Sequence, residues 1–142
     1  MRSSVLRSRI KTLIRASSLG AAGVLVAGCS SGFERFRTLH EKAGQRFSQL
    51  GIANIVHKLE DGSKGSFELG IYDRIVANFA FLDQPREFID NIASNGVMIA
   101  PVGPPDGIQM MKKYTKIGSR LQVENLFEVR VQSALHGISK AI

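Results

Sequence analysis

The chain has very little cysteine, with one thiol in 142 residues. That residue, Cys29, can form no disulfide within the chain and cannot supply a cysteine-rich metal site. The three histidines, His40, His57 and His136, have no carboxylate or cysteine companions at the spacing of metal ligands. We therefore expect structural or solvated histidines and no metal centre.

An excess of basic over acidic residues is also nearly absent outside the N-terminal segment, although the formal net charge of the whole chain is +7. Five of the 19 basic residues lie in the first fifteen positions, so 14 basic residues face 12 acidic ones in the rest of the chain. The five are Arg2, Arg7, Arg9, Lys11 and Arg15. Since the remainder has no basic stripe interleaved with aromatics, the sequence predicts no nucleic-acid partner.

The N-terminal segment has the pattern of an export signal. The basic residues are followed by an uncharged run, Ala16 to Ala27, which is too short to cross a bilayer as a mature helix. Its end, Val26-Ala27-Gly28-Cys29, resembles the lipobox of bacterial lipoproteins, in which the cysteine is acylated and the leader is cut before it. The resemblance implies lipidation of Cys29, a leader over residues 1–32 and a membrane-anchored product. The alternative is a chance apolar N-terminus on a cytoplasmic protein.

The body, residues 33–142, is organised around the stretch from Ile71 to Gly103. A short β-branched run is followed by apolar residues at helical spacing and then by a second apolar run closed by Pro and Gly. This pattern predicts a strand, a crossover helix and a second strand. Because such a connection joins parallel neighbours, the fold class is α/β, with its functional edge at the carboxyl ends of the strands.

The flanking elements fit the same class. The capping-box pattern Thr38 to Glu41 predicts a helix start, and apolar residues at helical spacing continue to Leu50. A strand is predicted over Ile55–Leu59, ending at a turn. Two further strands, Ile108 to Lys116 and Leu121 to Val131, are predicted to form a hairpin on the sheet edge.

Several short pieces of the body occur together in one known family. They are Glu34-Arg35 before a helix, Asp61-Gly62 after a strand, Tyr72-Asp73-Arg74-Ile75-Val76, and Gly96 through Gly103. In order and spacing, the chain from Glu34 to Ile142 resembles the second half of bacterial protein-L-isoaspartate O-methyltransferases. The resemblance implies a Rossmann-like, doubly wound sheet, S-adenosylmethionine as cofactor, and methylation of isoaspartyl residues in proteins or peptides as the first step of repair.

The resemblance assigns a cofactor-binding role to three residues. It places Glu34 after the second strand of the family, where a carboxylate accepts hydrogen bonds from the ribose hydroxyls of the cofactor. It places Asp61 opposite the adenine, with Gly62 allowing close approach of the backbone. On the residues alone, the preferred interpretation is a surface charge at Glu34 and a turn former at Asp61, and the family resemblance reverses that preference.

The family's first strand and Gly-rich loop have no counterpart in the sequence pattern. The corresponding region, Arg9 to Gly20, contains neither an acidic residue nor Gly-x-Gly-x-Gly. We therefore expect an incomplete sheet with an exposed inner edge, self-association through that edge, and little or no activity. Two alternatives stay open: a lipid-anchored envelope protein with a non-catalytic α/β body, and a subunit that completes its sheet with a separately encoded first half.

Overall fold

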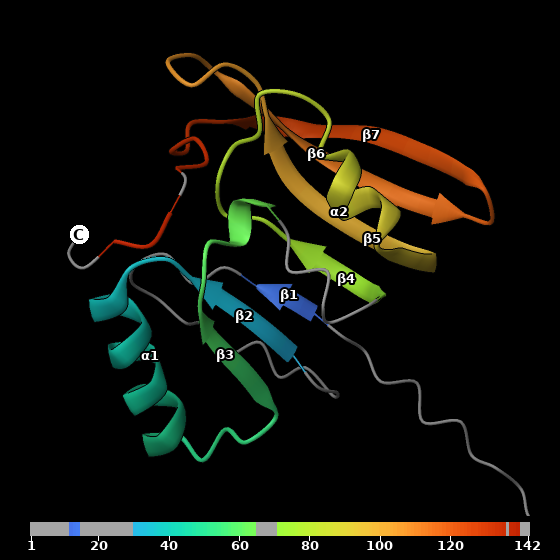
Figure 1. Cartoon of the computed structure of the whole chain (residues 1–142). Coiled ribbons are helices and arrows are strands. Elements are labelled where there is room, and N and C mark those ends of the chain that lie inside the picture. The colour runs from blue at the N-terminus through green and yellow to red at the C-terminus, as the bar shows by residue number, and fades with distance from the viewer. Residues whose placement is uncertain (1–11, 15–29, 65–70, 136, 140–142) are drawn as a thin grey trace, which may run out of the picture.

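The computed structural model describes residues 12–14, 30–64, 71–135 and 137–139, which form one mixed sheet flanked by helices (Figure 1). The strand order is β3-β2-β1-β4-β5-β6-β7, with β1 to β5 parallel and the last two strands antiparallel. The strands are β1 (Thr12–Ile14), β2 (Ser30–Glu34), β3 (Ile55–Leu59), β4 (Tyr72–Val76), β5 (Ile92–Val102), β6 (Gln109–Ile117) and β7 (Arg120–Val129). The helices are α1 (Arg37–Gln49), α2 (Arg86–Asp90) and the 3-10 turn η1 (Gly62–Lys64). The α/β class with a Rossmann-like sheet is confirmed.

The expectation that the first strand is missing was wrong. Residues Thr12–Ile14 form a short strand that pairs in parallel with β2 on one side and with β4 on the other. The inner edge on which we based self-association is therefore filled. We missed this strand because its three residues stand between Lys11 and Arg15, and we assigned the whole basic stretch to a leader. The expected boundary at residue 32 falls inside β2.

The unit from Ile71 to Gly103 is confirmed as strand, helix and parallel strand. The helix is shorter than the apolar spacing suggested, because Pro85 starts it and β5 already begins at Ile92. Asn95 has a φ of 64°, and a Cβ on Gly96 would lie 2.5 Å from a side-chain atom of Ile92. This irregularity bends the start of β5, and regular pairing with β4 resumes at Val97.

Helix α1 is confirmed, but its predicted capping box is not. The N-cap residue is Phe36, and no side-chain capping bond is present among the described residues. Thr38 lies inside the first turn, where its buried Oγ1 has no partner in that part of the chain. The amide of Arg37 donates instead to the carbonyl of Ser139 at 3.1 Å. A distant segment therefore satisfies one of the open amides at the start of α1.

The predicted hairpin is confirmed at the sheet edge, as β6 and β7 joined by a tight turn. Gly118 in this turn has a φ of 60°, a conformation that glycine adopts without steric cost. Residues after β7 return along the carboxyl edge of the sheet, towards the N-terminal end of α1 (Figure 1).

The core lies over β4, β5 and α2. Buried aromatic and aliphatic side chains from these elements and from the segment after β4 pack with one residue from β2 and one from β6. Phe81 packs between Phe79 and Phe88, tilted against the first ring and edge-on to the second, with centroids 4.7 and 5.2 Å apart. The full cluster is Phe33, Tyr72, Ile75, Ala77, Phe79, Phe88, Ile89, Ile92, Met98, Ala100 and Tyr114. Within the described ranges, no helix is long and apolar enough to cross a membrane.

Gln109 is the polar residue that fixes the end of β6 to the chain beyond β7. Its side chain is 1% exposed. The amide nitrogen donates to the carbonyls of Pro104 and Val131 at 3.0 and 3.2 Å, and the amide oxygen accepts from the Val131 N–H at 2.9 Å.

Replacing Gln109 with alanine is expected to lower the free energy of unfolding by about 2–4 kcal/mol, because buried backbone groups of Val131 lose their partners. Urea unfolding followed by circular dichroism measures this difference. Gln122→Ala, at an exposed position on β7, is the matched control and should change stability by less than about 0.5 kcal/mol. Equal stability of the two variants would contradict the role given to Gln109.

Candidate functional site

The carboxyl ends of β2 and β3 bring the two predicted acidic residues to one edge of the sheet. In the parallel register Glu34 lies beside Leu59, and the Glu60 N–H donates to the Glu34 carbonyl at 3.0 Å. Asp61 follows immediately. Neighbouring parallel strands have their carboxyl ends at the same edge of the sheet. Glu34 and Asp61, far apart in sequence, therefore lie close together at the edge where a doubly wound sheet binds its ligands.

Glu34 is fully buried, with 0% of its surface exposed. Its Oε1 accepts from the Phe36 N–H at 3.0 Å, which holds the side chain against the start of α1. Its Oε2 is buried without a hydrogen-bond partner in the described part of the chain. A carboxylate oxygen that is buried without a hydrogen bond lowers the stability of the fold unless a donor binds to it. The site therefore offers a strong acceptor for a hydroxyl or amide donor.

Asp61 is held by its own loop and by the C-terminal region. Its Oδ1 accepts from the N–H and the hydroxyl of Ser63, at 3.0 and 2.6 Å. Its Oδ2 accepts from the Gly137 N–H at 2.7 Å. The first pair is an Asx-type turn that begins η1. Asp61 is thus both the turn former that its sequence context suggests and a carboxylate at the carboxyl edge of the sheet.

Gly62 lies against the side chain of Phe33 on β2. A Cβ at position 62 would stand 3.2 Å from the Cβ of Phe33, so a larger residue would push the loop away from the strand. A cavity of about 10 Å³ adjoins both residues, which is close to the volume of one water position. Typical small-molecule sites are far larger, at roughly 300 Å³ or more, so this cavity by itself does not hold a nucleotide.

Two sequence predictions lie outside the described residues. Cys29, the predicted lipidation site, is one of them. The other is the missing Gly-rich loop, predicted for the region Arg9 to Gly20, of which the structure describes only residues 12–14.

The C-terminal strap, residues 130–135 and 137–139, is a part of the edge that sequence reasoning missed. Its Gly137 and Ser139 contact the residues around Glu34 and Asp61. The residues after Val131 have no apolar periodicity that would have assigned them to any element. Only the tertiary structure brings them to the site.

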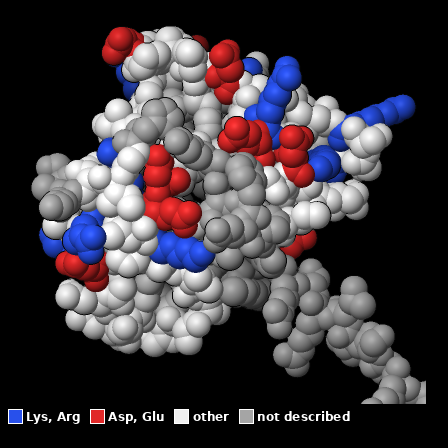
Figure 2. Space-filling model, in the orientation of Figure 1, with Lys and Arg blue, Asp and Glu red and all other residues white. Residues whose placement is uncertain are grey.

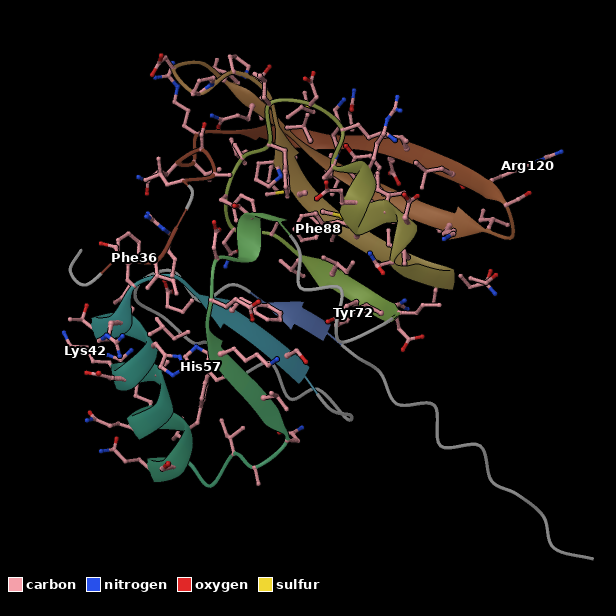
Figure 3. The ribbon with its side chains drawn as sticks, in the orientation of Figure 1. Phe36, Lys42, His57, Tyr72, Phe88 and Arg120 are labelled. Carbon is pink, nitrogen blue, oxygen red and sulfur yellow. The ribbon has the colours of Figure 1, made fainter. Side chains whose placement is uncertain are left out.

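A pair of histidines is the second missed feature. His40 on α1 stacks on His57 of β3, with ring centroids 4.2 Å apart and planes inclined by 22°, and Phe47 packs edge-on against His57 at 5.5 Å. His57 points towards α1 (Figure 3). Both nitrogens of His57 and the Nδ1 of His40 are buried without partners among the described residues. The pair therefore joins α1 to the sheet through ring packing.

Charges on the visible face are mixed. Figure 2 shows Lys and Arg interspersed with Asp and Glu rather than gathered in one basic patch. In the residues that the structure describes, no group of three or more His, Cys, Asp or Glu side chains could hold a metal ion.

The strand order, with an acidic residue at the carboxyl ends of β2 and β3, defines a Rossmann-like methyltransferase fold. A solved structure named protein-L-isoaspartate O-methyltransferase superposes with a TM-score of 0.75 at 22% identity, covering 89% of this chain and 42% of that one. A putative protein-L-isoaspartate O-methyltransferase from Plasmodium falciparum, in complex with S-adenosyl-L-homocysteine, superposes with a TM-score of 0.66 at 23% identity, covering 76% and 53%.

The chain belongs to the protein-L-isoaspartate(D-aspartate) O-methyltransferase family, whose sequence model matches residues 9–135. The protein-L-isoaspartate O-methyltransferase of Bradyrhizobium sp. (strain ORS 278) is 36% identical over 109 residues, which is 77% of this chain and 51% of the relative. That of Caulobacter vibrioides (strain NA1000 / CB15N) is 37% identical over 108 residues, or 75% and 48%. The chain thus spans about half the length of these curated relatives. The family match begins ahead of β1, well before Glu34.

The histidine pair predicts a pH dependence of stability. Burial, and secondarily the neighbouring His40, lowers the pKa of His57 from 6.5 to about 4. The folded state therefore favours neutral His57, so its contribution is complete above pH 6.5 and is lost as the pH falls through about 4. The loss is on the order of 3 kcal/mol.

His57→Phe, which retains an aromatic ring and cannot titrate, should flatten this part of the stability profile. Urea unfolding of both proteins at several pH values between 7 and 4 measures the difference. An identical slope in the two proteins would show that His57 does not carry the effect.

Proposed function

We propose that this chain is the S-adenosylmethionine-binding part of a protein-L-isoaspartate O-methyltransferase. The observation that carries the proposal is the buried Oε2 of Glu34, which has no partner among the described residues and lies at the carboxyl end of β2. A ribose presents two neighbouring hydroxyl donors, and a carboxylate is the acceptor that suits them. The residues present fit the cofactor that the family uses.

Asp61 and Gly62 would complete the nucleotide side of the site. The Asp61 carboxylate is oriented by Ser63, so it can accept a hydrogen bond from an exocyclic amine without first being ordered. Gly62 keeps the loop close to Phe33, which leaves an apolar surface beside the carboxylate. We propose that the adenine lies against this loop.

The cofactor would supply a methyl group on a sulfonium, which transfers to a carboxylate oxygen as the carbon–sulfur bond breaks. We propose isoaspartyl-containing proteins or peptides as substrates, as in the family. Their carboxylate is already ionised at neutral pH, so the protein needs no strong general base. Its task is to hold the two reactants in line, a contribution that reaches effective molarities of about 10⁵ M or more.

We further propose that this polypeptide alone has little or no turnover. Residues 15–29 contain no acidic residue and no Gly-x-Gly-x-Gly, the groups expected to hold the methionine part of the cofactor. The matched length is about half that of the curated relatives. A site that has the groups for the nucleotide but lacks those for the methionine part can bind the cofactor without aligning its methyl group with the substrate.

A membrane-anchored lipoprotein is the alternative, and it depends on the sequence Val26 to Cys29. Cleavage before Cys29 would remove Thr12–Ile14, the strand that joins β2 to β4. Mass spectrometry of the protein from its native cells distinguishes the two: we expect an unmodified Cys29 and residues 12–14 retained, whereas an acylated N-terminal Cys29 would establish the lipoprotein.

Glu34→Gln should weaken binding of S-adenosylhomocysteine about tenfold or more, because a neutral amide replaces the charged carboxylate that accepts the ribose hydrogen bonds. Isothermal titration calorimetry measures the affinity, and a thermal melt checks that the variant folds. Glu41→Gln, which removes an exposed carboxylate of α1, is the matched control and should leave affinity unchanged. Equal binding by the two variants would remove Glu34 from the site, and absence of binding by the unsubstituted chain would overturn the proposed function.

A further inference from the structure

The C-terminal strap runs along the carboxyl edge of the sheet. Near β4, the Ala80 N–H donates to the Gln132 carbonyl and the Ala134 N–H donates to the Ala80 carbonyl, both at 3.0 Å. Further on, Ser139 forms a parallel bridge with Phe36, which follows β2. The strap therefore extends from the end of β4 to the ends of β2 and β3, the edge at which this fold class binds its ligand (Figure 1).

At its tip, Gly137 uses both of its backbone groups on the candidate site. Its N–H donates to Oδ2 of Asp61 at 2.7 Å, and its carbonyl accepts from Nε of Arg35 at 2.8 Å. Gly137 has a φ of 82°, a conformation that favours glycine. A bond between a backbone amide and a carboxylate is among the stronger hydrogen bonds, so Asp61 is the main attachment point of the strap.

Ser139 adds a second attachment. Its N–H donates to the Arg35 carbonyl at 2.9 Å, and its carbonyl accepts from the Arg37 N–H at 3.1 Å. The latter bond satisfies an amide at the start of α1 for which no side-chain cap is present in the described residues. Phe36 lies between this end of α1 and the strap (Figure 3).

The strap is held by buried hydrogen bonds at its start, near Val131, and is exposed to solvent at its tip, around Gly137. Buried Gln109 bonds both backbone groups of Val131 at its base. At its tip, Gly137 is exposed and the Ile138 side chain is 57% exposed, so apolar burial contributes little. Segments held by a few polar contacts at the surface open more readily than the core. The tip can therefore detach while the base stays in place.

We propose that the C-terminal strap is an autoinhibitory gate over the nucleotide site. In the closed state the Gly137 N–H occupies Oδ2 of Asp61, and the Gly137 carbonyl is held by Nε of Arg35, the residue next to Glu34. A nucleotide that donates a hydrogen bond to Oδ2 of Asp61 competes with the Gly137 N–H for that oxygen, so strap and nucleotide compete. This inference rests on the proposed function, because it takes S-adenosyl nucleotides as the ligand of this edge.

A disulfide tests the gate in the full chain. Phe36→Cys and Ser139→Cys, combined with Cys29→Ser to remove the native thiol, place two cysteines at a bridged pair, where neighbouring Cα atoms suit a disulfide. With the strap locked by oxidation, S-adenosylhomocysteine should bind about tenfold or more weakly, and reduction should restore binding. The Cys29→Ser parent, oxidised and reduced, is the control. Equal affinity of the locked and reduced forms would overturn the gate.

The opposite change is Gly137→Pro, which removes the N–H that bonds Asp61 and cannot adopt the positive φ. It should bind S-adenosylhomocysteine about fivefold or more tightly than the parent, because the closed state loses its main attachment. Ile138→Ala, which alters an exposed side chain and no strap bond, is the control and should bind as the parent does. Binding that is equal in all forms overturns the gate alone. No binding in any form, Gly137→Pro included, overturns the proposed function and the gate together.

Discussion

The pairing of β1 with β2 and β4 is the constraint on which the rest of the structure depends. Three residues, Thr12–Ile14, form the link in the strand order between β3-β2 and the four strands that begin at β4. Without that link the described sheet would consist of two separate pieces, each with an unpaired edge. The position of Glu34 relative to the core around Ile75 and Phe79 follows from this short strand.

The same edge that presents the acidic residues also receives the end of the chain. Glu34 and Asp61 stand at the ends of adjacent parallel strands, and the C-terminal strap supplies donors and acceptors to the backbone and side chains around them. The start of α1 obtains a hydrogen bond from Ser139 rather than from a local side chain. The start of α1 and the loop at Asp61 are thereby held by the same segment.

The longer helices and strands could be predicted from the sequence because apolar spacing and turn residues within each stretch indicate its secondary structure. The β-α-β unit and the β6–β7 hairpin have apolar spacing and turn residues that need no distant partner to be interpreted. The strand Thr12–Ile14 has only three residues between two basic ones, too few for a period to be seen. The capping box at Thr38 is not formed because α1 begins at Arg37, which places Thr38 inside the helix, and the Arg37 amide bonds the distant Ser139 carbonyl, a contact that no short-range rule represents.

The sequence by itself determined the α/β class, the family, and the placement of Glu34 and Asp61 after consecutive strands, since strand periodicity and short motifs are properties of neighbouring residues. Only the tertiary structure decided that Thr12–Ile14 completes the sheet, that His40 stacks on His57, and that Gly137 reaches Asp61. These contacts join segments separated by long stretches of chain. Their formation depends on how strands are ordered and how ends are packed, which no local pattern encodes.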